Sequence, residues 1–255
     1  MNVVLIGAGR GQRLMPLTAH EPKSLTPVAG KRIVDWILEA FRQNGLDRFV
    51  FIGGYLIDVV RDNYPHFQMV ENPDWPNNNI LFSLLHARDY LGDGFYATYT
   101  DTLYRPSAVA ALKASTHDRT LVMDTRWRHR YRFRKMHPEA DAEKMIATDG
   151  RVERISRAIA PADASGEFTG VMRMTASGAE KFLDYFDRLH AEYEDDGIFA
   201  EGRPFRVAYL IHQFEHMIDV GIDIHCVSVP GEYHEIDTME DYQLASDDWA
   251  RFARS

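Results

Sequence analysis

The sequence is poor in cysteine, in positive charge and in long apolar runs. Its single cysteine, Cys226, excludes an internal disulfide and suits a reducing compartment. The formal net charge of −9 argues against general binding to nucleic acid. No apolar run has the length of a membrane span, and the first residues lack the basic and long apolar stretches of a signal peptide. We therefore expect a cytoplasmic protein with neither nucleic acid nor membrane as a partner.

The first loop, in "VVLIGAGRGQRLMPLTAHEPKSL", also lacks the complete form of two common phosphate-binding motifs. The dinucleotide fingerprint requires glycine at its first, third and sixth positions. Gly7 and Gly9 fit, but Gln12 stands in the sixth place, which argues against a dehydrogenase. No Gly-Lys-Ser/Thr closes the run as in a Walker loop. The loop must serve another phosphate ligand or none.

Alternating strand and helix patterns predict an α/β fold. Short apolar runs typical of buried parallel strands lie at residues 2–9, 48–55, 67–72, 95–101 and 119–125. Runs with helical spacing lie between or after them, at residues 32–46, 56–64, 79–93 and 106–115. This order implies a doubly wound, mostly parallel, Rossmann-like sheet with its ligand edge at the carboxyl ends of the strands.

The second half adds a hairpin-bearing insertion. Two alternating runs flank Asp149-Gly150, a strong signal for a hairpin over residues 142–156. Strands are expected at residues 166–175 and 222–231, and helices at 176–196, 207–221 and 238–254. The last helix has Thr238 and Asp241 in capping positions. With no linker in the chain, we expect a single domain over residues 1–255.

The first loop resembles the signature of the nucleotidyltransferases, Gly-x-Gly-x-Arg-Leu-x-Pro-Leu-Thr followed by Pro-Lys-x-Leu-x-Pro-Val. The matching residues are Gly9, Gly11, Arg13, Leu14, Pro16, Leu17, Thr18, Pro22, Lys23, Leu25, Pro27 and Val28. Residues 72–91, 124–145 and 231–242 are similar to segments of the phosphocholine cytidylyltransferases and their phosphonate-activating relatives. The resemblance implies transfer of CMP from CTP to phosphocholine, 2-aminoethylphosphonate or a similar acceptor, with release of pyrophosphate. It also implies a nucleotide-binding half at residues 1–125 and an acceptor-binding half at residues 126–255.

The residues of the first loop also suit phosphate binding on physical grounds. Because Gly7, Ala8, Gly9 and Gly11 have little or no side chain, their backbone N–H groups can surround a triphosphate. Arg13 is expected to hold the β- and γ-phosphates, and Lys23 to supply charge at the α-phosphate. The alternative is a structural turn with two solvated cations.

Two distant aspartates are the candidate metal ligands. Asp101 follows a predicted strand, at the ligand edge of such a sheet. The resemblance pairs it with Asp237 as ligands of Mg²⁺, which prefers one or two carboxylates together with phosphate oxygens. Glu235 is a candidate for a supporting role beside them. The alternative reading makes both aspartates turn or helix caps.

Amides and cations supply the candidates for the two substrates. By resemblance, Asn78, Asn79 and Ser83 read the cytosine, although Asn79 also suits a helix cap. The residues expected by resemblance or composition to bind the acceptor are Lys144, Arg128, Arg134, Tyr131, Tyr209, Tyr233 and Glu167. For each of them, surface or packing roles are the alternative.

Two other functions stay open on the sequence. One is a sugar-1-phosphate nucleotidylyltransferase that uses another nucleoside triphosphate. The other is a catalytically silent nucleotide-binding domain, against which the joint presence of Arg13, Lys23, Asp101 and Asp237 argues. No histidine has metal-ligand spacing, and the reaction needs no general base because the attacking phosphate or phosphonate oxygen is already anionic. The identity of the acceptor and the oligomeric state stay undetermined.

Overall fold

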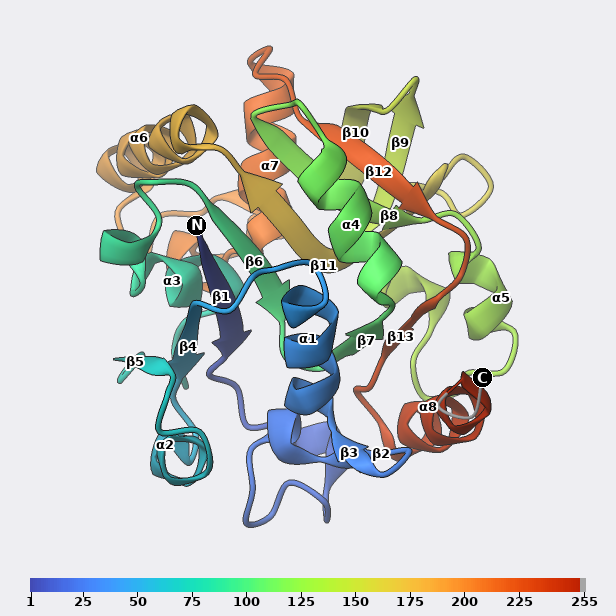
Figure 1. Cartoon of the computed structure of the whole chain (residues 1–255). Coiled ribbons are helices and arrows are strands. Elements are labelled where there is room, and N and C mark those ends of the chain that lie inside the picture. The colour runs from blue at the N-terminus through green and yellow to red at the C-terminus, as the bar shows by residue number, and fades with distance from the viewer. Residues whose placement is uncertain (253–255) are drawn as a thin grey trace.

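Apolar segments distributed along the whole chain form one nine-stranded sheet, with helices on both faces (Figure 1). The computed structural model describes residues 1–252. In the order in which they lie, the strands are β5 (Gln68–Glu71), β4 (Phe49–Gly53), β1 (Asn2–Gly7), β6 (Phe95–Tyr99), β11 (Gly166–Met174), β8 (Arg119–Asp124), β12 (His225–Val229), β10 (Arg151–Ser156) and β9 (Lys144–Thr148). Two small sheets join β2 (Pro27–Val28) to β3 (Lys31–Arg32) and β7 (Thr102–Tyr104) to β13 (Tyr233–Glu235).

The helices bury an apolar core on each face of this sheet. They are α1 (Ile33–Arg42), α2 (Ile57–Asn63), α3 (Ile80–Leu85), α4 (Pro106–Ala114), α5 (Trp127–Tyr131), α6 (Ala176–Tyr193), α7 (Leu210–Asp219) and α8 (Met239–Phe252). One core packs α1, α2, α4 and α8 against the sheet, and the other packs α3, α6 and α7. Within residues 1–252, no helix is long and apolar enough to cross a membrane.

The α/β class is confirmed, but the sheet is mixed and the expectation of a mostly parallel sheet is wrong. Strands β5, β4, β1 and β6 are parallel, as are β8 and β12. Strand β11 lies antiparallel between β6 and β8, and β10 lies antiparallel to β9 and β12. A parallel neighbour needs a crossover of a dozen or more residues, usually helical. No helix lies between residues 144 and 174, so this part of the chain pairs antiparallel.

Local patterns in the sequence predict most helices and strands, with boundaries that lie within a few residues of those in the structure. The hairpin around Asp149-Gly150 forms as β9 and β10, at one edge of the main sheet. The cap of α8 also forms, because the backbone N–H of Asp241 donates to Thr238 Oγ1 at 3.2 Å and that of Thr238 to Asp241 Oδ2 at 2.9 Å. Residues 253 and 254 of that predicted helix lie outside the described residues. Helix α5 and the pairing of β7 with β13 were not predicted.

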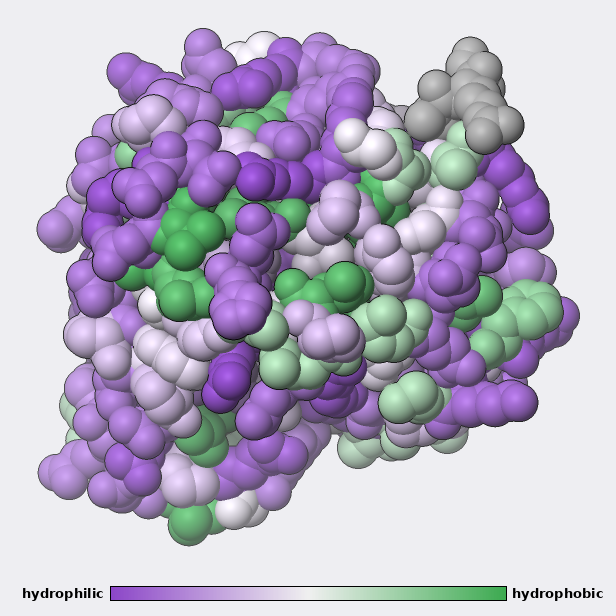
Figure 2. Space-filling view, turned by 90° about the horizontal axis from the view of Figure 1, so that it is seen from below, coloured by the Kyte–Doolittle hydropathy of each residue, from purple (hydrophilic) through white to green (hydrophobic). Residues whose placement is uncertain are grey.

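The strand ends and the small sheet position the site. The parallel strands β1, β4 and β6 end at the lower edge in Figure 1, and Figure 2 looks onto that largely hydrophilic side. Directly after β6, the backbone oxygen of Asp101 accepts a hydrogen bond of 2.9 Å from Ile236 N. Since β13 pairs with β7, the chain next to Asp237 is fixed beside Asp101.

A bulge in β11 depends on a single glycine. The register against β8 shifts between Phe168 and Met172, and Gly170 between them has φ of 75°. A Cβ at Gly170 would lie 2.4 Å from Cδ2 of Tyr99, on the neighbouring strand. Only glycine adopts this backbone conformation and this close approach without strain.

We therefore expect Gly170→Ala to lower the free energy of unfolding by about 1–3 kcal/mol, through backbone strain and the clash with Tyr99. Urea denaturation followed by circular dichroism measures this change. Gly92→Ala is the control, because an added Cβ there meets nothing within 4 Å, and its effect should stay within about 0.5 kcal/mol. Equal stability of the two variants would contradict the role assigned to Gly170.

Candidate active site

A cavity of about 710 Å³ lies where these strand ends, the first loop and the second half of the chain meet. Its lining comes from segments that are far apart in the sequence. They are the first loop up to Ser24, Trp75 with Asn78, Asn79, Ile80 and Ser83, the end of β6 with residues 100 and 101, His137 with Asp141 and Glu143, Arg157, the start of β11, Arg203 with Tyr209, and Tyr233 with Glu235 and Asp237.

The first loop lines one side of the cavity as the sequence predicts. Gly7, Ala8, Gly9 and Gly11 all contribute to the lining. A Cβ on Gly7 would lie 2.6 Å from Thr100 Oγ1, so a larger residue would displace the neighbouring strand end. Gly11 has φ of 66°, a conformation that L side chains rarely adopt. The path of the loop thus depends on glycine at these two positions.

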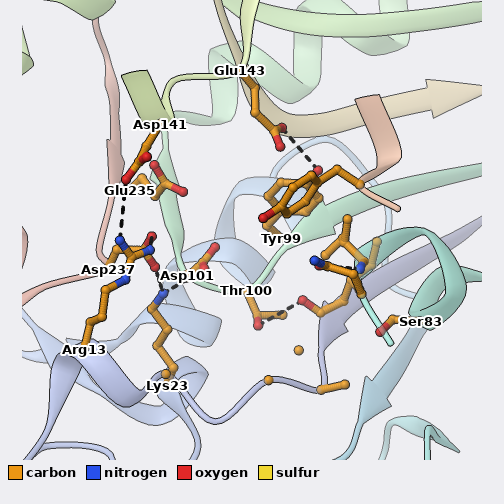
Figure 3. A pocket seen from close by; sticks show the side chains of 18 of the residues that line it. Arg13, Lys23, Ser83, Tyr99, Thr100, Asp101, Asp141, Glu143, Glu235 and Asp237 are labelled. Atoms are coloured by element: carbon orange, nitrogen blue, oxygen red, sulfur yellow. Dashed lines mark hydrogen bonds and ion pairs between the residues drawn. The ribbon is translucent and has the colours of Figure 1, made fainter. Parts of the chain in front are cut away.

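Charged side chains from this loop and from three other segments meet in the cavity (Figure 3). Lys23 Nζ donates to Asp101 Oδ2 at 2.8 Å and also to Asp237 Oδ1. The Nη2 of Arg13 donates to the other oxygen of Asp237, and its Nη1 lies 3.7 Å from Asp141 Oδ2. Lys23 is largely buried, whereas Arg13 is 54% exposed. The structure therefore brings together the cations and the two distant aspartates that the sequence predicts.

The pKa values in this cluster follow its charges. Burial disfavours the charged form of Lys23, but Asp101 and Asp237 outweigh it and raise the lysine pKa. Burial likewise disfavours a charged Asp237, yet Lys23 and Arg13 outweigh it and lower the aspartate pKa. Glu235 has a pKa well above its ordinary value, because of burial and then repulsion by Asp237 and Asp101. The ion pairs thus remain charged at neutral pH.

The same cluster contains oxygen atoms suited to a divalent cation. Asp101 Oδ1 is buried and has no hydrogen-bond partner, although Oδ2 binds Lys23. The side-chain ligand atoms of His137, Glu235 and Asp237 lie within 4.8 Å of one another. Carboxylate oxygens are the ligands that Mg²⁺ prefers, so the donor set fits the predicted ion.

A group of amides lines another part of the cavity. Asn78, Asn79 and Ser83 are all in the lining. Buried Asn72 exchanges two hydrogen bonds with Asn78, at 2.9 and 3.0 Å, and donates to Ser83 Oγ at 2.9 Å. Asn79 also caps α3, because its Oδ1 accepts from Ile80 N at 2.8 Å. The sequence did not indicate Asn72, whose hydrogen bonds hold Asn78 and Ser83 in place.

Only some of the residues predicted to bind the acceptor reach the cavity. Glu167, Tyr209 and Tyr233 line it. Lys144 does not, because its Nζ is buried and donates to the backbone oxygens of Glu139 and Ala142, at 3.2 and 3.1 Å. Arg128 lines a separate pocket next to α5, with its side chain 55% exposed.

Tyr131 and Arg134 are also outside the cavity lining, because both are bound within the protein. The hydroxyl of Tyr131 donates to Glu167 Oε1 at 2.7 Å. The Nε of Arg134 lies 2.8 Å from Asp241 Oδ1, and its Nη2 donates to the backbone oxygen of Glu235 at 2.8 Å. The placement gives Lys144, Arg128, Tyr131 and Arg134 no direct role at the cavity.

Other residues that the sequence did not indicate take their place. Glu143, Arg157 and Arg203 line the cavity near Tyr209. Burial raises the pKa of Glu143 to about 7, against the opposing effect of Arg157. Glu143 precedes Lys144 in the segment "DAEKM", and of this pair Glu143 is the residue that lines the cavity. Arg157 and Arg203 stand in no motif that could have identified them.

Comparisons with known proteins agree with this geometry. Residues 3–176 match the MobA-like NTP transferase domain. The chain is 25% identical over 255 residues to the CTP:phosphoglutamine cytidylyltransferase of Campylobacter jejuni, with 96% of this chain and 98% of that protein covered. It is 21% identical over 250 residues to the choline-phosphate cytidylyltransferase of Streptococcus pneumoniae, with 95% and 96% covered.

Two solved structures have the same fold. The CTP:phosphocholine cytidylyltransferase of Streptococcus pneumoniae has a TM-score of 0.72 and 21% identity, with 97% of this chain and 98% of that chain covered. The inositol-1-phosphate CTP transferase of T. maritima has a TM-score of 0.74 and 21% identity, with 96% and 94% covered. The resemblance to the cytidylyltransferase branch is thus confirmed. The chain belongs to the MobA-like NTP transferase family and is a nucleotidyltransferase.

Proposed function

We propose that this enzyme transfers CMP from CTP to a small acceptor that bears a phosphate or phosphonate, with Mg²⁺ as cofactor and pyrophosphate as the second product. The observation that carries this proposal is the meeting of Lys23, Asp101 and Asp237 beside the glycine loop, in the same cavity as the amides around Asn78. The names of relatives support the nucleotide and the acceptor class, since they include phosphoglutamine, choline-phosphate and 2-aminoethylphosphonate cytidylyltransferases.

The reaction exchanges one bond at the α-phosphorus of CTP. An oxygen of the acceptor's phosphate or phosphonate forms the new bond, and the bond to the β-phosphate oxygen breaks as pyrophosphate leaves. The attacking oxygen is anionic at neutral pH, so no residue has to remove a proton. The chain's own contribution is therefore to bind both anions in line and to neutralise their charge.

The first loop and the charged residues beside it serve different parts of this function. Backbone N–H groups of the first loop and the exposed guanidinium of Arg13 bind the departing β- and γ-phosphates. Lys23 supplies a positive charge where negative charge grows at the α-phosphate. Asp101 and Asp237 hold Lys23 in position and offer the oxygens for Mg²⁺. When bound, the ion supplies further neutralisation of the phosphate charge.

The choice of nucleotide is tested by measuring pyrophosphate release with each of the four nucleoside triphosphates, in the presence of Mg²⁺ and a panel of small phosphates and phosphonates. We expect CTP to be preferred, with a kcat/KM at least about tenfold above that of UTP, because two misplaced hydrogen bonds to the base cost this much. Preference for another nucleotide together with a sugar-1-phosphate would instead indicate a sugar-activating enzyme. A chain without turnover on any acceptor would be a silent binding domain.

Asp101→Asn should reduce kcat by about 100-fold or more, since it removes a charge that orients Lys23 and holds the cofactor. Steady-state kinetics with CTP and the best acceptor measure this effect, with circular dichroism to verify folding. Asp93→Asn is the matched control, because Asp93 is exposed and outside the cavity lining. A kcat close to that of the wild type in Asp101→Asn would remove this residue from the mechanism.

Asn78→Ala should raise the KM for CTP about tenfold, because it removes a hydrogen-bonding amide from the cavity and breaks both hydrogen bonds between Asn78 and Asn72. The adjacent Asn77→Ala is the control, since that exposed amide donates to Asp74 Oδ1 at 2.6 Å and does not line the cavity. The KM values for CTP of the two variants are compared at saturating acceptor. An equal KM in both would exclude Asn78 from nucleotide binding.

A further inference from the structure

Two carboxylates on the acceptor side of the cavity are already paired with arginines of the protein. Glu167 accepts from Arg130 Nη2 and from Tyr131. Glu143 Oε1 accepts from Arg157 Nη2 at 3.4 Å. A cationic end of an acceptor that approaches Glu167 or Glu143 would have to displace one of these arginines.

Two of the tyrosine rings in the lining are also covered by arginines. The guanidinium carbon of Arg157 lies 3.9 Å from the ring centroid of Tyr209, and that of Arg203 lies 5.1 Å from it. The Arg130 guanidinium lies 4.5 Å from the ring of Tyr233. A choline-like head group depends on an open aromatic face, because it has no N–H donor. At Tyr209 and Tyr233, the protein's own arginines occupy the position that such a head group would need.

The guanidiniums near Tyr209 have donors that the protein does not use. Arg157 Nε is buried and has no hydrogen-bond partner, although the side chain lines the cavity. Arg203 donates to the Tyr209 hydroxyl at 3.3 Å, lies 3.8 Å from Glu201, and is 44% exposed. Each guanidinium has five N–H donors arranged in a fork that matches a carboxylate.

This arginine pair lies apart from the groups that face the reacting phosphate. In Figure 3 Glu143 is drawn at the top beside Tyr99, and Lys23 at the lower left; Glu143 is the residue to which Arg157 is bonded. The pair therefore suits a second anionic group of the acceptor, at the end remote from its phosphate or phosphonate.

We infer that the acceptor carries a carboxylate at this remote end, bound by Arg157 and Arg203 beside Tyr209, and that these arginines select against choline-like acceptors. The inference rests on the proposed cytidylyl transfer and narrows its acceptor to phosphorylated or phosphono amino acids and related acids. Arg157 and Arg203 are then the residues that determine acceptor specificity.

Two pairs of acceptors that differ only in a carboxylate test the inference. O-Phosphoserine is compared with phosphoethanolamine, and 2-amino-3-phosphonopropionate with 2-aminoethylphosphonate, with phosphocholine as a fifth substrate. In CTP-dependent pyrophosphate release, we expect the carboxylate-bearing member of each pair to have a kcat/KM at least about tenfold higher, as a charge-assisted bidentate contact provides. Phosphocholine should be the poorest acceptor.

Arginine variants connect this preference to the residues. In Arg157→Gln and Arg203→Gln, the ratio of kcat/KM between the members of each pair should fall about tenfold. Arg154→Gln is the matched control, because Arg154 is exposed, outside the cavity lining, and pairs with Glu215 at 3.2 Å; it should keep the wild-type ratio. If the Arg157→Gln variant does not fold, the Arg203→Gln variant still tests the inference, because Arg203 is more exposed.

The outcomes separate the inference from the proposed function. Turnover of phosphocholine at least as fast as that of phosphoserine would overturn the inference and leave cytidylyl transfer intact. An equal loss with both members of a pair in the arginine variants would also overturn it, since the arginines would then bind the reacting phosphate. Absence of CTP-dependent turnover with every acceptor would contradict the proposed function and the inference with it.

Discussion

The site depends on one buried ammonium group shared by two carboxylates. Lys23 joins Asp101 and Asp237, which are 78 and 214 positions away from it in the chain. Without this cation, Asp101, Asp237 and Glu235 would repel one another in a poorly solvated place. The lysine therefore allows three acidic groups to converge at the strand ends, and their convergence offers oxygens to a metal ion.

Much of this arrangement could be predicted because it follows from chain direction. Parallel strands end at the same edge of a sheet, so a loop after β1 and an aspartate after β6 must lie near each other. The apolar runs that form these strands are unambiguous, and the glycines at Gly7 and Gly11 mark a close approach and a left-handed turn. Asp237 is different, because its position depends on the pairing of β13 with β7 and was inferred from resemblance alone.

The acceptor side of the cavity could not be predicted, because the burial of each charged side chain in the fold decides where it lies, and the spacing of these residues in the sequence does not show it. In the basic run of residues 126–135, Arg130 and Arg134 turn inward to carboxylates, while Arg128 remains exposed. The sequence shows the density of charge but not the direction of each side chain. The arginines that do reach this side of the cavity are isolated in the sequence: Arg157 directly follows β10, whereas Arg203 lies in a loop before α7, and no local pattern reveals that they meet.

An acidic chain that binds polyanions faces a constraint that explains the design of the cavity. With a net charge of −9, any unpaired carboxylate in the lining would add to the repulsion of a triphosphate and a second phosphate. The acidic groups of the cavity are accordingly neutralised in different ways: Glu167 by Arg130, Asp237 by Lys23 and Arg13, and Glu143 by Arg157 together with a pKa raised to about 7 by burial. In this arrangement the carboxylates hold the protein's own cations in fixed positions, where those cations can bind anions.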